Sequence, residues 1–223
     1  LDVFKYLQDQ GVDIHAGDND AYSPMHRAVQ EGQLDVLKYL QGQGADIHAR
    51  VHTSHSAVHL AAQAGQLDVV KYLQDQGVDI HAMGDNGSAM HAAAQFGHLH
   101  VVKYLHNQGA DILAKNNDGW WSPLLLACDD GHAEVAAFLL RKKAGVGSDG
   151  ALPSGTSFLH LAAKKGHVAV VEAIVSAHPN PAAWHKFLMG CGALSELRAL
   201  GAAPPAPNAP RNYLPRIYDA GMP

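Results

Sequence analysis

The sequence LDVLKYLQGQGADIHA at residues 34–49 decides the fold because the chain repeats it. Residues 1–16 read LDVFKYLQDQGVDIHA and residues 67–82 read LDVVKYLQDQGVDIHA, each at an offset of 33. A looser copy, LHVVKYLHNQGADILA, occupies residues 99–114. A fixed period near 33 indicates a linear stack of similar repeats that share one continuous apolar core, and a stack of this kind offers a long surface instead of an enclosed pocket.

Each repeat is predicted to contain two helices, as residues 23–44 illustrate. The first helix runs from about residue 24 to 31, with Ser23 as its N-cap and Pro24 in its first turn. The second runs from about residue 34 to 43 and carries leucines at helical spacing along one side. A glycine follows each helix and ends it, because glycine adopts the left-handed conformation without strain.

Composition narrows the classes of partner. The chain has 223 residues, 47% of them apolar, and a net charge of −5 with both signs mixed along the sequence. This balance gives no electrostatic basis for binding nucleic acid or an anionic membrane. No apolar run approaches the ~18 residues of a membrane span. Two cysteines, Cys128 and Cys191, lack metal-ligand spacing and fit a reducing compartment.

The recurring motifs resemble the ankyrin repeat. The family's Thr-Pro-Leu-His is matched by Ser-Pro-Met-His, Ser-Ala-Val-His, Ser-Ala-Met-His and Ser-Phe-Leu-His at residues 23–26, 56–59, 88–91 and 157–160. Its Gly-His-Leu-x-Val-Val and Gly-Ala-Asp-Val-Asn-Ala stretches are matched best at residues 97–102, 166–171 and 44–49. The resemblance covers roughly residues 1–178. It implies an all-α repeat fold, an α-solenoid of stacked helix-turn-helix ankyrin repeats joined by hairpin loops.

Departures from the motif suggest the domain organisation. Residues 1–17 match the second half of a truncated N-terminal repeat, so we expect that residues upstream have been lost or left unresolved. Residues 18–178 form the array, interrupted by an irregular finger loop at about 144–155 that is rich in glycine. Residues 179–201 are a degenerate C-terminal capping repeat, and residues 202–223 a Pro-rich extended tail. Within the array, Leu125 stands where the motif histidine is expected.

The 16 histidines invite a metal or catalytic interpretation, which the sequence does not favour. The motif histidines, such as His26 and His59, are in positions where the resemblance implies hydrogen bonds to backbone that link adjacent repeats. His52 and His55 are the best metal candidates, but no cysteine or carboxylate completes a ligand set. Cys128 is followed by two aspartates that oppose a thiolate. With no phosphate-binding loop or serine elbow either, we expect no enzyme activity, no metal and no cofactor.

The resemblance also indicates the binding surface. In ankyrin arrays the two residues before the inter-helix glycine face the concave groove, and the hairpin tips project beside it. A solvated face is the alternative interpretation of these polar positions. Phe96 would be costly there unless a partner covers it. Two adjacent tryptophans cannot both point inward from one turn, so at least one of them is either exposed for contact with a partner or packed on the 145–155 loop. The candidate partner-binding residues are Tyr22, Glu31, His55, Gln63, Gln95, Phe96, Trp120, Trp121, Asp129, Asp130, Lys164 and Lys165.

The function expected is protein–protein recognition by a scaffold, adaptor or inhibitor that binds a partner protein through its hairpin tips and concave helix face. An alternative is the targeting or substrate-recognition part of a larger effector or enzyme whose catalytic domain lies outside this chain. A third hypothesis, ligand or nucleic-acid binding, is opposed by the absence of a basic groove. We expect a monomer in the cytoplasm, or one delivered into a host cytoplasm if the protein is a bacterial effector.

Overall fold

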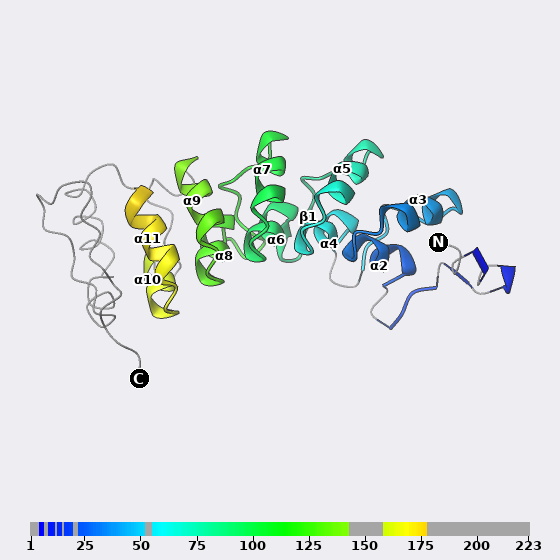
Figure 1. The fold of residues 1–223 in the computed structure, drawn as a ribbon, viewed down its shortest axis with the longest axis horizontal. Helices are drawn as coiled ribbons and strands as arrows, with labels where there is room; N and C mark the ends of the chain where they lie inside the picture. The colour runs from blue at the N-terminus through cyan, green and yellow to red at the C-terminus, as the bar shows by residue number, and fades with distance from the viewer. Residues whose placement is uncertain are drawn as a thin grey trace, which may run out of the picture. The chain divides into compact units, whose positions relative to one another are not determined.

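The computed structural model describes residues 5–6, 9–11, 13–14, 16–19, 22–51, 55–142 and 158–177, and consists of helix pairs joined by turns (Figure 1). The first helices of the pairs are α2 (Pro24–Gln30), α4 (Ala57–Gln63), α6 (Ala89–Gln95), α8 (Pro123–Asp129) and α10 (Phe158–Lys164). The second helices are α3 (Leu34–Gly42), α5 (Leu67–Asp75), α7 (Leu99–Asn107), α9 (Ala133–Arg141) and α11 (Val168–Ala177). The predicted first pair is therefore confirmed, and each of its helices ends one residue earlier than expected.

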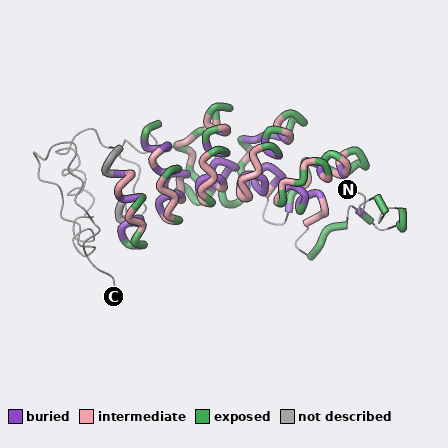
Figure 2. The backbone as a smooth tube through the Cα atoms, in the orientation of Figure 1, coloured by how far each residue is buried: buried purple, intermediate pink, exposed green. Residues whose placement is uncertain are grey.

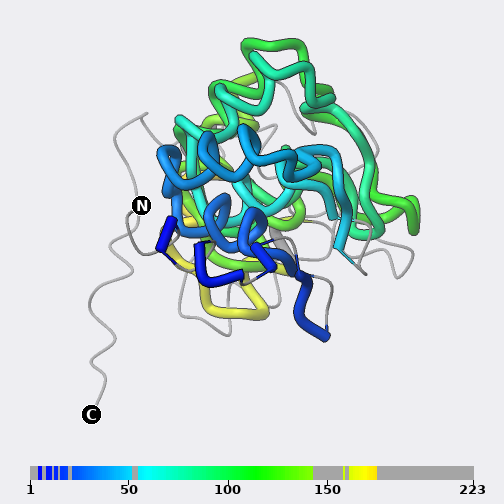
Figure 3. Tube along the Cα trace, turned by 90° about the vertical axis from the view of Figure 1, so that its right-hand side faces the viewer, coloured from blue at the N-terminus to red at the C-terminus, as the bar shows by residue number. Residues whose placement is uncertain are grey.

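Contacts divide the chain into two compact units, Leu1–Pro123 (unit 1) and Leu124–Pro223 (unit 2). In unit 1, α2, α4 and α6 pack side by side in one layer, and α3, α5 and α7 form a second layer (Figure 1). The view turned by 90° shows these pairs overlapping, with the connections between them to one side (Figure 3). In unit 2, α9 packs against α11, and α11 packs against α10.

The core of unit 1 lies between its two helix layers, where the buried backbone segments of Figure 2 concentrate. Leucines of the second helices, such as Leu37 and Leu73, are fully buried, and so are Met25, Leu60 and Met90 of the first helices. Within each helix the helical period places the apolar residues on one side, and the repeat of about 33 residues brings the same pattern back in the next pair. Unit 2 has its own buried side chains; the largest include Leu125, Leu139 and Ile174.

The turn between the helices of a pair depends on its glycine. In the second described pair Gly65 has φ +74°, and the Gln66 amide donates a hydrogen bond to the Ala61 carbonyl at 2.8 Å. This bond reaches back five residues and satisfies a carbonyl at the helix end, as in a Schellman motif. The His167 amide donates to the Ala162 carbonyl in the same way at 2.9 Å. The glycines predicted from sequence to end the helices thus have the expected role.

The hairpins between pairs are short. β1 (Met83–Gly84) and β2 (Gly87–Ser88) pair in antiparallel register, and an isolated bridge joins Arg50 to Ser56 in the preceding hairpin. Before each hairpin an aspartate closes a local turn. The Oδ1 atom of Asp46 accepts a hydrogen bond from the amide two residues on at 2.8 Å, and Asp79 does the same at 2.9 Å. This is the Asx turn that aspartate favours.

Several predicted segments fall outside the description. The finger loop at about 144–155, the capping repeat at 179–201 and the tail at 202–223 lie outside the described residues, as do parts of residues 1–17. Within the part of the chain that is described, every helix is too short or too polar to cross a membrane.

Candidate partner-binding surfaces

The motif histidines of α2, α4 and α6, which are His26, His59 and His91, each lie within hydrogen-bond distance of a carbonyl in the connection that follows their helix pair. His59 Nδ1 lies 3.3 Å from the Ser56 amide nitrogen and 2.9 Å from Ser56 Oγ, and its Nε2 lies 3.1 Å from the Gly87 carbonyl oxygen. An amide can only donate, so Nδ1 accepts and the proton is on Nε2, which donates to the carbonyl. His91 repeats the arrangement with Ser88 and with the Ala114 carbonyl at 3.1 Å. The predicted structural role of these histidines is confirmed.

Burial keeps these imidazoles neutral. Desolvation lowers the pKa of His59 to about 4, and the nearby His55 adds to the effect. Burial also lowers the pKa values of His26 and His91, although their carbonyl partners act in the opposite sense. A proton added to Nδ1 would face the serine amide proton and break the cap. The hairpins are therefore held in place by bonds that require neutral histidine.

A row of glutamines ends the first helices of unit 1. Gln30, Gln63 and Gln95 are the last residues of α2, α4 and α6, and we call them the Gln row. Their main chains are tied together. Gln66 Nε2 donates to the Gln30 carbonyl at 3.1 Å, and His98 Nε2 lies 2.9 Å from the Gln63 carbonyl oxygen. The row is thus at fixed positions of three adjacent helices.

Phe96 follows the Gln row and is the C-cap of α6, with 45% of its surface exposed. At the equivalent positions after α2 and α4 the chain has exposed Glu31 and half-buried Ala64. Gln63 and Gln95 are half-buried residues, and within the described part of the chain their side-chain amides have no hydrogen-bond partner. The structure thereby brings three of the predicted binding residues to one place: Gln63, Gln95 and Phe96.

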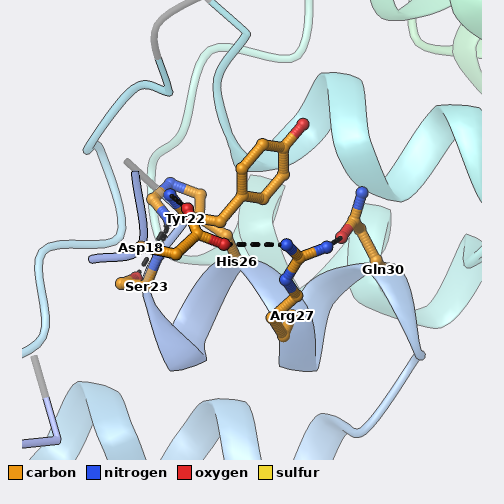
Figure 4. A network of polar contacts seen from close by, with 6 residues as sticks. All are labelled: Asp18, Tyr22, Ser23, His26, Arg27 and Gln30. Atoms are coloured by element: carbon orange, nitrogen blue, oxygen red, sulfur yellow. Dashed lines mark hydrogen bonds and ion pairs between the residues drawn. The ribbon is translucent and has the colours of Figure 1, made fainter. Parts of the chain in front are cut away.

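Tyr22 belongs to a contact network around the start of α2 (Figure 4). The Arg27 guanidinium lies 4.5 Å from the centre of the Tyr22 ring and donates to Asp18 at 2.8 Å. The same guanidinium donates to Gln30 Oε1 at 3.3 Å, and the ring of His26 meets that of Tyr22 edge-on at 6.1 Å. Tyr22 and the Gln30 amide are therefore already engaged within the chain, unlike the two other glutamines of the row.

The hairpin segments of unit 1 stack on one another. Arg50 Nη1 donates to the Met83 carbonyl at 3.5 Å, and Asn117 Nδ2 donates to the Gly84 carbonyl at 2.9 Å. In the last hairpin, Asn116 Oδ1 accepts hydrogen bonds from the amides of both tryptophans, at 3.3 Å from Trp120 and 3.2 Å from Trp121.

The two tryptophans of this hairpin differ in their exposure to solvent. Trp120 is 47% exposed while Trp121 is half-buried, so one of the pair projects into solvent as the sequence predicts.

His55 lies directly before Ser56, in the hairpin whose bridge joins Arg50 to Ser56. It is half-buried, and its ring centre is 5.5 Å from that of His59. Burial lowers its pKa. The other predicted metal candidate, His52, lies outside the described residues, and the described ones hold no group of three or more metal-ligating side chains.

The predicted charged positions of unit 2 partly neutralise one another. Lys165 Nζ forms an ion pair with Asp129 Oδ1 at 2.6 Å, and His167 Nε2 lies 2.8 Å from the Asp129 carbonyl oxygen. Asp130 and Lys164 are exposed. All four of these charged residues are candidate partner contacts in the sequence, whereas the structure joins one acidic and one basic member of the set to each other.

Two exposed apolar side chains of unit 1 were not among the binding residues predicted from the sequence. Leu113 is 57% exposed and Met83 is 40% exposed, both in the connections between helix pairs. A signal was present for Leu113, because it takes the turn position that His48 and His81 occupy in the other copies of the repeat. Met83 gave no such signal.

Cys128 has no role at these surfaces. It is fully buried, and desolvation, with a smaller contribution from Asp129, raises the pKa of its thiol. A buried neutral thiol is a poor nucleophile. The side chain therefore packs as a small apolar group.

Family comparisons agree with this geometry. Residues 43–116 and 90–183 match the family described as ankyrin repeats (3 copies), and residues 20–51 match the family described as ankyrin repeat. The chain belongs to the ankyrin repeat family. Ankyrin repeats are in general protein–protein interaction modules and are typically not catalytic. No curated protein matches the chain.

Proposed function

We propose that this ankyrin array recognises a partner protein as a scaffold, adaptor or inhibitor, with unit 1 making the main contact. The observation that carries the proposal is the exposure of two large aromatic side chains, Phe96 and Trp120, on a hydrogen-bonded framework. Exposed aromatics of this size are typical anchors of protein interfaces.

The framework supports this use because it is ordered before binding. Both helix ends of each pair in unit 1 are fixed by backbone bonds, and the hairpins are fixed by histidine bonds to carbonyls such as Gly87 and Ala114. Little conformational entropy is then lost when a partner docks, so side chains on the surface contribute more of their contact energy to affinity.

An affinity capture experiment with mass spectrometry tests the proposal. The full chain and a Phe96→Ala, Trp120→Ala, Trp121→Ala variant would be used as baits in lysate of the source cells. The matched control, Lys71→Ala, Lys103→Ala, Asn107→Ala, changes three exposed residues of the other helix layer. Melting curves would establish that all three baits are folded.

We expect a protein that the wild type and the control capture and that the aromatic variant loses. Equal recovery by all three baits would contradict the assignment of the site to these aromatics. Failure of every bait to capture a specific protein would contradict the proposed function itself.

A further inference from the structure

The Gln row and Phe96 have a spacing and a chemistry that fit one kind of ligand. Helices packed side by side are about 8–10 Å apart, and α2, α4 and α6 are packed in this way. Amide side chains at the same position of successive helices therefore recur at roughly this interval. A polyproline II helix rises about 3.1 Å per residue with three residues per turn, so it presents equivalent groups about every 9 Å.

Hydrogen bonding matches as well. The backbone carbonyls of polyproline II have no internal hydrogen bonds and are free to accept. Gln63 and Gln95 have side-chain amides that donate, and within the described residues neither has a partner. Both residues are half-buried, and an acceptor on a ligand would give their amides the hydrogen bond that they lack within the described residues.

The third feature of this surface is the apolar side chain of Phe96. Phe96 is exposed beside the row, and Ala64 takes the equivalent place one repeat earlier, so a side chain of the ligand can lie against the phenyl ring without obstruction from Ala64. Aromatic side chains are the usual platform for proline rings in polyproline II recognition. The Gln63, Gln95 and Phe96 side chains carry no charge, which favours an uncharged ligand over a basic or acidic peptide.

We propose that Gln63, Gln95 and Phe96 bind a proline-rich segment of the partner protein, in the polyproline II conformation and with prolines at every third position. The proposal deepens the proposed function by naming the class of segment that the partner presents. The amides donate to carbonyls one turn apart, and Phe96 packs against a proline ring.

Binding of a synthetic peptide to the full chain tests the proposal. The probe is an uncharged, fluorescein-labelled peptide of four Pro-Pro-Ala triplets, followed by fluorescence anisotropy. A peptide of equal composition with its prolines in an irregular order is the matched ligand control. We expect saturable binding of the first peptide, at least tenfold tighter than the second and unchanged between low and high salt, because no charges are involved.

Variants of the chain locate the contact. Gln63→Ala, Gln95→Ala and Phe96→Ala should each weaken binding about fivefold to tenfold, the effect of losing one hydrogen bond or one ring contact. Gln63→Glu should weaken it as strongly, because a carboxylate cannot donate. Gln108→Ala, an exposed glutamine at the C-cap of α7, is the control and should leave affinity unchanged.

The proposal would be overturned by no saturable binding, by equal binding of both peptides, or by an affinity that none of the Gln63, Gln95 and Phe96 variants changes. If the chain self-associates and the peptide dissociates it, the occupant is the segment around Pro204, Pro207 and Pro210 of a second copy, and a partner protein is excluded. If the array captures a partner in a Phe96-dependent way and that partner lacks a proline-rich segment, the proposed function is supported and only this inference is contradicted.

Discussion

The second helices of the two units carry different chemistry at two equivalent positions. In unit 1 the Tyr72 hydroxyl donates to Gln41 of the preceding repeat, and Gln41 Nε2 donates to Gln76 at 2.9 Å. In α9 of unit 2 the tyrosine position is taken by Phe138 and the Gln41 position by Leu140, and both are buried.

At these positions unit 1 therefore uses a polar mode, with bonds of fixed geometry between its repeats. The helix α9 uses an apolar mode, with two buried side chains. The second mode is less sensitive to exact register, because apolar contacts are not directional. The same backbone framework accepts both. Substitutions that convert one mode into the other test how much each contributes.

The largest effect is expected at the turn that both units share. A Cβ atom on Gly65 would lie 2.6 Å from His98 Nδ1, and one on Gly131 would lie 2.8 Å from His167 Nδ1. Both glycines have positive φ, at +74° and +84°. Proline cannot adopt this conformation, so Gly65→Pro should lower the free energy of unfolding by about 3 kcal/mol or more, measured by urea denaturation.

Gly109→Ala is the control for this prediction. Its φ is +89°, but a Cβ atom there would meet nothing within 4 Å, so only the conformational cost of about 1 kcal/mol remains. If Gly131→Pro left stability unchanged while Gly65→Pro did not, the turns of the two units would not be equivalent.

Acid should destabilise unit 1 through its capping histidines. Because burial lowers the pKa of His59 to about 4, the unfolded chain binds more protons than the folded chain between about pH 4 and 6.5. Stability therefore rises with pH across this window and is lost as pH falls through it. From His59 alone we expect a loss of about 2 kcal/mol between pH 7.5 and 5.0 in urea denaturation.

His26 and His91 should add to this loss, since burial lowers their pKa values too. A stability that stays constant from pH 7.5 to 5.0 would contradict the neutral, bonded state of these imidazoles.

The next largest loss of stability is expected when a capping histidine is replaced by leucine, which is the residue at the equivalent position of α8. His91→Leu copies Leu125, but it leaves the Ser88 amide and the Ala114 carbonyl without their partner. A buried group left unpaired costs about 1–3 kcal/mol, so we expect a loss of about 2 kcal/mol at pH 7.5. The acid sensitivity of the variant should also be smaller than that of the wild type, which a purely volumetric effect would not produce.

The smallest effect concerns the polar bonds of the second helices. Tyr72→Phe copies Phe138 and removes the hydroxyl that donates to Gln41. An intramolecular hydrogen bond contributes about 0.5–1.5 kcal/mol net, and this one is partly exposed, so a loss of at most about 1 kcal/mol is expected from thermal unfolding. Tyr6→Phe is the control, because the Tyr6 side chain is 64% exposed. A gain in stability would show that the apolar mode of α9 is the stronger one.

The sequence predicts most of this fold because its signals are local. Helix starts follow from Ser23 and its equivalents, helix ends follow from glycines, and the period follows from repeated leucines. The roles of the capping histidines were predicted through the family resemblance. These features depend on neighbours within about one repeat, which a single sequence exposes.

Features that depend on side-chain contacts between repeats were not predicted. The ion pair of Lys165 with Asp129 joins residues that are far apart in sequence, and nothing in the residue types requires it. The exposure of Met83 depends on how two hairpins stack. The free amides of Gln63 and Gln95 could not be foreseen, because an identical residue at the same position, Gln30, finds a partner in Arg27.

The repetition of residues 34–49 and 67–82 has a consequence for how the chain folds. Tyr104 donates to Gln74 just as Tyr72 donates to Gln41, so a helix pair that docks one repeat out of place meets a chemically equivalent partner. Misdocking of this kind is a characteristic kinetic trap of repeat proteins. Side chains that differ between repeats, such as His98 in place of Gln66, then distinguish the correct neighbouring repeat from an incorrect one.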